Sequence, residues 1–363
     1  MMNVLVVTPY LYDSAPGQRY RIEQWARWLH NAGVTFTFVP FESKALKEVL
    51  YAKGRHIEKA RELVRCVFNR CRWLAGFDPA RWDAIYLYRE LLPVGPPILE
   101  RILVNKGVPL VYDFDDAIFI PDTSEANRHF GWLKWARKTG TICRLSSHVI
   151  VGNDYLKQYA SKTSDHVSVV PPTIDTDAYT PREDYRIDGV PIIGWSGSLT
   201  TLKHVRTVEA ALRQLRKVVD FRLRIMGGDR LSIPGVDVET RNWTSATEAA
   251  EVRAFDVGIM PLPNEEWVQG KSALKALLYM ALGVPTVVSP VGVSTAIIDD
   301  GRNGFTAATD EEWVSKLSRL LGDEDLRRRF GREGRKTVES CYSARAQAPR
   351  VLEIMSRVAR SSN

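Results

Sequence analysis

The chain has 363 residues, 45% of them hydrophobic and 26% charged, and a formal net charge of +7. That length suits two domains with full cores, and the positive charge favours an anionic partner. The sequence has neither an uncharged apolar run of about 18 residues nor a basic leader, so we expect no membrane span and no signal peptide. The four cysteines lie outside Cys-x-x-Cys spacing. This excludes the usual zinc and disulfide patterns and indicates reduced thiols in the cytosol.

The amino-terminal residues alternate between strand and helix patterns. An apolar run at 4–8 predicts a buried parallel strand, and a second strand pattern covers 35–39. Between them, apolar residues with a period of about 3.6 predict a helix: Ile22, Trp25, Ala26 and Leu29. The loop at 14–18 carries no Gly-x-Gly-x-x-Gly motif, so this opening βαβ unit lacks the nicotinamide dinucleotide fingerprint.

Residues 44–82 carry most of the positive charge. Ten basic residues stand against four acidic ones there, a net charge of +6. Apolar residues recur every three or four positions, or seven across Lys53, which predicts amphipathic helices: Leu46, Leu50, Ile57, Ala60, Val64, Val67, Cys71 and Leu74. Such helices either dock on the sheet with a solvated basic face or rest on an anionic membrane surface. Nucleic acid is disfavoured because the aromatic residues are few and not interleaved for base stacking.

Strand patterns at 84–88 and 108–114 lead into charged residues. The second strand ends in three carboxylates, Asp113, Asp115 and Asp116, which repel one another unless a cation or a shared proton relieves them. Arg89 follows the first of these strands and is the nearest candidate for that cation.

Two short strand patterns, at 148–151 and 167–170, close a first domain that we predict to span 1–175. A polar, turn-rich stretch at 176–191 predicts an interdomain linker. A second α/β domain is then expected over 192–340, followed by a terminal helix within 341–363.

The second domain centres on residues 255–290. A buried strand at 257–260, a Pro-punctuated loop, a helix at about 272–282 and a strand at 286–289 form one βαβ unit. The loop of such a unit lies at the carboxyl edge of the sheet, where the amino end of a helix favours a phosphate. Lys271 and Lys275 are four residues apart, so both ammonium groups can reach one anion. The alternative is a buried helix with two solvated lysines.

Two motifs here resemble the donor-binding segment of the family-4 glycosyltransferases: MALGVPTVVSPVG at 280–292 and DDGRNGFTA at 299–307. Gly270 and Leu278 occupy the slots of the glutamates in that family's Glu-x7-Glu motif. The ribose-binding glutamate of the family therefore cannot be carried over. The chain instead resembles the subgroup that writes this segment Gly-Lys-x-x-x-Lys, which places lysines nearest the donor.

The resemblance implies a GT-B architecture, two doubly wound α/β domains facing a cleft, with 341–363 packing back on the first domain. It implies a retaining hexosyltransferase that needs no metal and no cofactor. The co-substrate would be a nucleotide-diphosphate sugar, and the acceptor a hydroxyl of a polysaccharide or lipid-linked glycan. An Asp-x-Asp metal site on Asp113 and Asp115 is the alternative, known from sugar transferases of another fold. The basic residues 44–82 would hold this cytoplasmic enzyme at the inner face of the membrane.

The resemblance also implies site residues. The donor diphosphate would meet Gly197, Ser198, Lys203, Lys271 and Lys275, with Ser198 standing where the family has an arginine. The nucleotide would meet Gly227, Gly228 and Trp243, unless Trp243 belongs to the core. The acceptor would meet Gly17, Arg19, Arg89 and Glu90. Asp115 falls on the family's acceptor-contacting histidine and Asp116 on the aspartate after it, so both are catalytic candidates.

Two other functions stay open. A sugar-nucleotide epimerase of the same fold would consume the nucleotide sugar without an acceptor. A non-catalytic protein with a degenerate site would bind the nucleotide sugar without turning it over.

Overall fold

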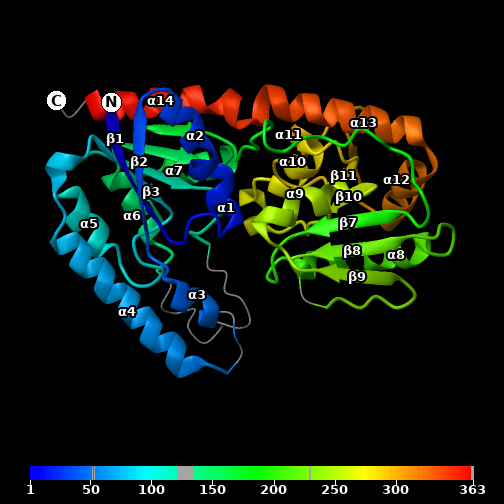
Figure 1. Cartoon of the computed structure of the whole chain (residues 1–363), viewed down its shortest axis with the longest axis horizontal. Coiled ribbons are helices and arrows are strands. Elements are labelled where there is room, and N and C mark those ends of the chain that lie inside the picture. The colour runs from blue at the N-terminus through cyan, green and yellow to red at the C-terminus, as the bar shows by residue number, and fades with distance from the viewer. Residues whose placement is uncertain (51, 53, 121–134, 229, 361–363) are drawn as a thin grey trace. The chain divides into compact units, whose positions relative to one another are not determined.

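The computed structural model describes residues 1–50, 52, 54–120, 135–228 and 230–360 (Figure 1). The chain divides into two compact units. Unit 1 comprises Met1–Pro172 together with the end of the chain from Gln347, and unit 2 comprises Thr173–Ala346. Each unit contains one six-stranded sheet in which neighbouring strands are parallel. This confirms the predicted pair of doubly wound parallel sheets.

Unit 1 is built on a sheet with the strand order β2-β1-β3-β4-β5-β6. Its strands are β1 Met2–Thr8, β2 Val34–Pro40, β3 Ala84–Tyr88, β4 Leu110–Phe114, β5 His148–Val151 and β6 Val167–Val169. Its helices are α1 Pro16–Gln18, η1 Arg19–Glu23, α2 Gln24–Asn31, α3 Lys44–Leu50, α4 His56–Ala75, η2 Pro79–Arg81, α5 Ile98–Val104, α6 Lys138–Leu145 and α7 Asp154–Ala160.

Unit 2 is built on a sheet with the strand order β12-β11-β10-β7-β8-β9. Its strands are β7 Ile192–Ser196, β8 Arg222–Met226, β9 Asp237–Arg241, β10 Val257–Met260, β11 Thr286–Val288 and β12 Phe305–Thr306. Its helices are η4 Leu202–Val208, α8 Glu209–Leu215, α9 Ser245–Arg253, η5 Glu266–Gly270, α10 Leu274–Ala281, α11 Ser294–Ile297, α12 Asp310–Gly322, α13 Glu324–Thr337 and η6 Val338–Tyr342. Helix α14, Ala344–Arg360, begins in unit 2 and continues into unit 1.

The central strands are apolar because helices cover both faces of each sheet. In β3, β4, β5 and β10 every residue is buried, whereas the edge strands β2, β6 and β9 are partly exposed. Across the described residues, no helix is long and apolar enough to span a bilayer.

The strand order of each sheet reverses direction at one place. In the first sheet the chain runs outward from β1 to β2 and then returns to β3 on the other side of β1. In the second sheet it runs from β7 through β8 to β9 and returns to β10 on the other side of β7. Loops leaving the carboxyl ends of two such strands diverge to opposite faces, which leaves a crevice where α/β proteins bind ligands. We therefore expect binding sites at the carboxyl ends of β1 and β3 in the first sheet, and of β7 and β10 in the second.

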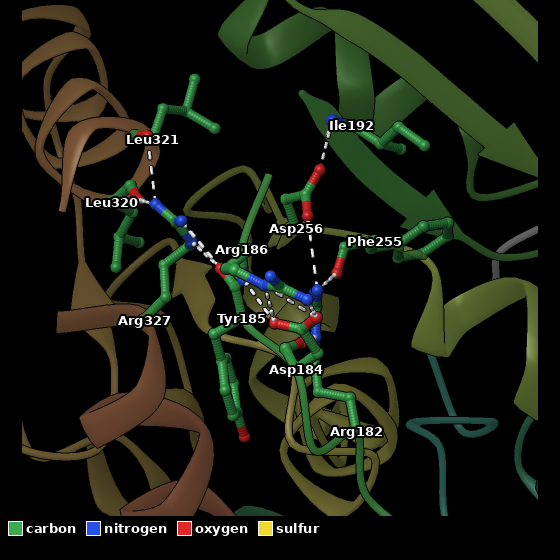
Figure 2. A network of polar contacts seen from close by, with 10 residues as sticks. All are labelled: Arg182, Asp184, Tyr185, Arg186, Ile192, Phe255, Asp256, Leu320, Leu321 and Arg327. Carbon is green, nitrogen blue, oxygen red and sulfur yellow. Dashed lines mark hydrogen bonds and ion pairs between the residues drawn. The ribbon is translucent and has the colours of Figure 1, made fainter. Parts of the chain in front are cut away.

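The stretch that we expected to link two domains, 176–191, lies within unit 2 and is bound to it by polar contacts (Figure 2). The guanidinium of Arg182 donates a 2.6 Å hydrogen bond to the carbonyl of Phe255, next to β10. The guanidinium of Arg327, on α13, donates 2.7 Å and 3.0 Å bonds to the carbonyl of Tyr185. These contacts attach the stretch to both a strand end and a helix of the second unit.

The basic stretch 44–82 forms α3 and α4, but α4 turns a different face inward than its apolar period predicts. Ile57 and Val64 are exposed, and so is Phe68. The buried side chains of α4 are Glu62, Cys66, Arg70 and Leu74. Arg70 can occupy this inner face because carbonyl oxygens of the sheet accept its hydrogen bonds, as described below. Lys53 lies outside the described residues.

Candidate functional site

The loops after β7 and β10, at the switch point of the second sheet, carry two of the predicted lysines. Lys203 lies in η4, and Lys271 directly follows η5. Their Nζ atoms lie 5.5 Å and 5.1 Å from the ring centroid of Trp267, which is itself in η5. Contact of an ammonium group with an indole face is attractive, so Trp267 holds both cations at this edge of the sheet. Trp267 is not among the site residues predicted from the sequence.

Lys271 and Lys275 do not share a helix face, contrary to the expectation from their spacing. Ala273 has a left-handed backbone with φ of +51°, so α10 begins at Leu274, and Lys271 remains extended. Lys275 lies in the first turn of α10, and its Nζ atom is 5.4 Å from the ring centroid of Trp195 at the end of β7. Tertiary packing, rather than helical spacing, brings these lysines to the same edge.

The positive charges of all three lysines act on His204. This imidazole is 3% exposed, and its ring centroid lies 5.4 Å from that of Trp267. Burial, together with the positive charges of Lys275, Lys203 and Lys271, lowers its pKa to about 4. Its Nε2 atom has no hydrogen-bond partner among the described residues. We call Lys203, Lys271 and Lys275 around His204 the lysine cluster; it gathers positive charge that an anion could neutralise.

Two glycines bring backbone close to the lysine cluster. A Cβ atom on Gly197 would lie 2.5 Å from the Trp195 ring and 2.7 Å from Cε of Lys275. Gly227, after β8, has a φ of +80°, and a Cβ there would lie 2.4 Å from the Gly197 carbonyl oxygen. Only glycine fits either position without displacing its neighbours. The two glycine turns are therefore packed against each other beside Lys275.

The remaining predicted donor residues lie around these turns. Gly228 packs under Leu202, where an added Cβ would lie 3.1 Å from a leucine methyl. Trp243 has its Cβ beside Gly227, and its indole N–H donates a 2.8 Å hydrogen bond to the buried Glu248. Ser198 is exposed, and its hydroxyl bonds to that of Thr200 at 2.9 Å. The structure thus brings all the predicted residues of the second domain to one edge of the sheet.

The switch point of the first sheet holds a network centred on Asp115, just after β4. Its Oδ1 accepts a 2.7 Å hydrogen bond from the Tyr88 hydroxyl and a 2.9 Å bond from Arg89, which also pairs with Asp116 at 2.7 Å. Arg89 is therefore the cation that relieves this acidic pair, as predicted. Oδ2 of Asp115 points toward Gly17 in α1, 3.0 Å from where a Cβ would stand.

The groups in this network shift one another's pKa values. Burial lowers the pKa of Arg89, but Tyr88, Asp115 and Asp116 outweigh that effect and raise it well above its usual range. Burial and the Asp115 carboxylate raise the pKa of Tyr88, although Arg89 opposes them, so the phenol stays protonated and donates to Asp115. Arg89 also has a φ of +61°, an unusual backbone for a residue with a side chain. Such strain is common at functional sites.

Two of the predicted acceptor residues are engaged elsewhere. The Arg19 guanidinium pairs with Asp13 at 2.7 Å, and Arg19 is largely buried. Glu90 pairs with Lys138 of α6 at 2.5 Å. The geometry thus brings Gly17 and Arg89 to the two aspartates, whereas Arg19 and Glu90 form ion pairs with other residues.

Asp113 pairs with Arg21, which is not among the site residues predicted from the sequence. Arg21 donates to both of its carboxylate oxygens, at 2.6 Å and 2.5 Å, and the Tyr86 hydroxyl donates to it as well. Both side chains of this ion pair are fully buried. The chain kinks at Arg21, whose non-helical backbone directs the side chain toward β4. Asp113 is thus paired within the core with a different cation from the one that holds Asp115.

The Asp-x-Asp pair is therefore divided between two cations, Arg21 and Arg89. Among the described residues, no group of three or more His, Cys, Asp or Glu side chains is placed to hold a metal ion. The two positions of the missing glutamates also differ from each other: Leu278 is a core residue of α10, and Gly270 ends η5 beside Lys271.

The segment that carries the lysine cluster matches a known protein family. Residues 190–323 match the family described as Glycosyl transferases group 1. D-inositol 3-phosphate glycosyltransferase from Stackebrandtia nassauensis is 30% identical over 201 residues, which cover 46% of this chain and 43% of that protein. The same enzyme from Paenarthrobacter aurescens is 27% identical over 226 residues, 54% of this chain and 53% of that protein. The chain spans about half the length of the curated relatives it matches.

Structural similarity extends over nearly the whole chain. Sucrose-phosphate synthase from Thermosynechococcus elongatus superposes with a TM-score of 0.71 at 15% identity, covering 99% of this chain and 100% of the synthase. Anabaena HepE, solved in complex with UDP-glucose, superposes with a TM-score of 0.67 at 14% identity, covering 98% and 100%. The chain has the GT-B fold. In GT-B terms, the lysine cluster lies in the second sheet domain and the Asp115 network in the first.

Proposed function

We propose that this GT-B protein is a retaining hexosyltransferase that moves a sugar from a nucleotide-diphosphate sugar to an acceptor hydroxyl. The lysine cluster carries the proposal, because it lies at the switch point of the second sheet, within the stretch that matches group 1 glycosyltransferases. A structural neighbour that was solved with UDP-glucose supports a uridine nucleotide as the first donor to test.

The donor diphosphate is proposed to bind against the lysine cluster and the Gly197 turn. Transfer breaks the bond between the anomeric carbon and the β-phosphate oxygen, and the electron pair leaves with the diphosphate. Negative charge therefore grows on that oxygen as the bond breaks. Ammonium groups already in place stabilise this charge without rearranging, which lowers the barrier.

Unit 1 is proposed to hold the acceptor. Tyr88 and Arg89 fix the Asp115 carboxylate through Oδ1, whereas Oδ2 makes no hydrogen bond within the described part of the chain. We infer that Oδ2 accepts a hydrogen bond from the acceptor hydroxyl beside Gly17, where a side chain would obstruct it. Asp116, held by the same arginine, would support this geometry. The proposed acceptor class is the one that the family resemblance implies, a hydroxyl of a glycan or lipid-linked acceptor.

Thermal melting with nucleotides tests the donor site. UDP or UDP-glucose at ~100 times its dissociation constant should stabilise the protein by about 2.7 kcal/mol. Lys203→Ala and Lys271→Ala should abolish the shift, whereas Lys217→Ala, at an exposed lysine elsewhere in unit 2, should leave it intact. If both cluster variants keep the full shift, the donor site is misplaced.

Turnover tests the reaction. UDP release should require an acceptor, and NMR of the product should show the same anomeric configuration as the donor. Donor consumption without acceptor would favour the epimerase. Nucleotide-sugar binding without turnover across a broad panel of glycans and lipid-linked sugars would favour a non-catalytic protein.

A further inference from the structure

Helix α4 exposes an apolar stripe. Ile57, Val64 and Phe68 are 86%, 68% and 65% exposed. Intervals of seven and four residues place these three side chains on one face of a helix. The adjoining helix α5 exposes two more large apolar side chains, Ile98 and Ile102, again four residues apart. Nearly half of the large apolar side chains that the described residues expose thus lie on two neighbouring helices.

Arginines follow one flank of this stripe. Arg61, Arg65 and Arg72 fall within about 80° of the apolar residues around the helix axis, on the same outward side. Arg72 is exposed, and the side chains of Arg61 and Arg65 are 73% and 70% exposed. The carboxylate of Glu62 lies beneath, 3.3 Å from Arg61 and 3.9 Å from Arg65, and leaves the flank positively charged.

The outward direction of this face is fixed by contacts on the opposite side of α4. The guanidinium of Arg70 is buried and donates 3.3 Å hydrogen bonds to the carbonyls of Val39 and Thr8, at the ends of β2 and β1. Rotating α4 to bury Phe68 would break these bonds, turn Arg70 outward and place an apolar ring over the two carbonyl oxygens. Buried acceptors left without a donor cost about 1–3 kcal/mol each. The exposure of the stripe is therefore a property of the fold.

We propose that the face formed by Ile57, Val64 and Phe68 with Arg61, Arg65 and Arg72 docks on a bilayer that contains anionic phospholipids. Apolar side chains gain free energy by entering the boundary between headgroups and acyl chains, while long arginine side chains reach lipid phosphates with two parallel N–H donors. The arginine flank favours an anionic lipid surface over a neutral one. This inference concerns where the protein acts and does not depend on glycosyl transfer.

Co-sedimentation of the full chain with vesicles tests the proposal. Vesicles of phosphatidylcholine with phosphatidylglycerol should bind the protein, and phosphatidylcholine alone should bind it far less. Phe68→Ser should weaken partitioning about tenfold, because it removes one deeply inserted aromatic side chain. Arg61→Gln, Arg65→Gln and Arg72→Gln should each weaken it about fivefold at low salt.

Unit 2 offers a matched control. Val218 is 69% exposed, and three basic residues closely precede it in the chain: Arg213, Arg216 and Lys217. Val218→Ser and glutamine at those three positions should leave vesicle binding unchanged, and thermal melting checks that every variant is folded. The proposal would be overturned if the control variants lost as much vesicle binding as the α4 variants. It would also be overturned if Phe68→Ser left vesicle binding unchanged. A concentration-dependent dimer that Phe68→Ser abolishes would assign this face to a second copy instead.

Discussion

Cε of Lys275 lies 2.7 Å from the point that a Cβ atom would occupy on Gly197. The same point is 2.5 Å from the ring of Trp195, which is buried and cannot move away easily. Gly197→Ala should therefore displace Lys275 from the lysine cluster. We expect UDP affinity to fall about tenfold or more, and the free energy of unfolding to fall by about 1–3 kcal/mol from overpacking.

Calorimetric titration with UDP and urea unfolding measure these two effects. Gly322→Ala is the control, because a Cβ there meets nothing within 4 Å. Unchanged UDP affinity in a folded Gly197→Ala protein would show that the turn is not part of the donor site.

The Asp115 network predicts a split between binding and turnover. Asp115→Asn keeps the shape of the side chain but removes the carboxylate that we place beside the acceptor hydroxyl. We expect turnover to fall by a factor of about 10²–10⁴ while UDP affinity stays the same, since the donor site lies in the other unit. Steady-state kinetics and UDP titration on one preparation measure both. Full turnover in Asp115→Asn would remove this residue from the proposed reaction.

The buried ion pair of Arg21 and Asp113 predicts a large effect on stability. Burial lowers the pKa of Arg21, but the neighbouring Asp113 carboxylate outweighs it and raises that pKa above its ordinary value. Arg21→Met leaves a buried carboxylate without its cation and should lower the free energy of unfolding by about 3–5 kcal/mol. Chemical denaturation measures this.

Two further variants test whether the loss comes from the unpaired buried charge. Combining Arg21→Met with Asp113→Leu should restore part of the loss, because no charge then remains buried. Arg216→Met, which breaks a largely exposed pair with Asp220, should cost less than about 1 kcal/mol. Equal costs for Arg21→Met and Arg216→Met would contradict the buried-pair argument.

The buried imidazole of His204 predicts a loss of stability in acid. Its pKa of about 4 lies below the ordinary 6.5, first because of burial and then because of Lys275, Lys203 and Lys271. The unfolded chain therefore takes up this proton at a higher pH than the folded chain. Stability from this group is fully present above pH 6.5 and is lost as the pH falls toward 4. Urea unfolding at pH 7.5 and at about pH 4 measures how much the free energy of unfolding falls between the two. His204→Gln should make that fall smaller by about 1–3 kcal/mol.

A bound diphosphate should reverse part of this shift. Its negative charge would offset the three ammonium groups, so the pKa of His204 should rise when UDP binds. NMR titration of the imidazole resonances with and without UDP measures the change, and the exposed His30 serves as an internal reference. An unchanged His204 pKa at saturating UDP would place the diphosphate away from the lysine cluster.

The unit β10–α10–β11 illustrates what local sequence can predict. Its strands are short apolar runs, and Gly283 and Pro285 mark the break between α10 and β11. Residues close together in the chain therefore predict this unit. The same holds for the loops that carry Lys203 and Lys271. The start of α10 was less predictable, because it depends on a left-handed Ala273 that the surrounding packing enforces.

Helix α4 illustrates the opposite case. An apolar period identifies an amphipathic helix, but it does not say which face meets the sheet. Arg70 decided that face, because carbonyl oxygens at the ends of β1 and β2 accept its hydrogen bonds. The residues next to Arg70 in the sequence do not predict those acceptors.

The sequence by itself determined the alternation of strands and helices, the two α/β domains and the loops with glycines and lysines, because all of these follow from short-range periodicity and residue type. Only the tertiary structure decided strand order, and hence which loops lie at the switch points. It also paired Arg21 with Asp113 and gathered three lysines around His204. Such contacts join residues far apart in the chain, and their energies depend on burial and distance in space, which spacing along the chain does not encode.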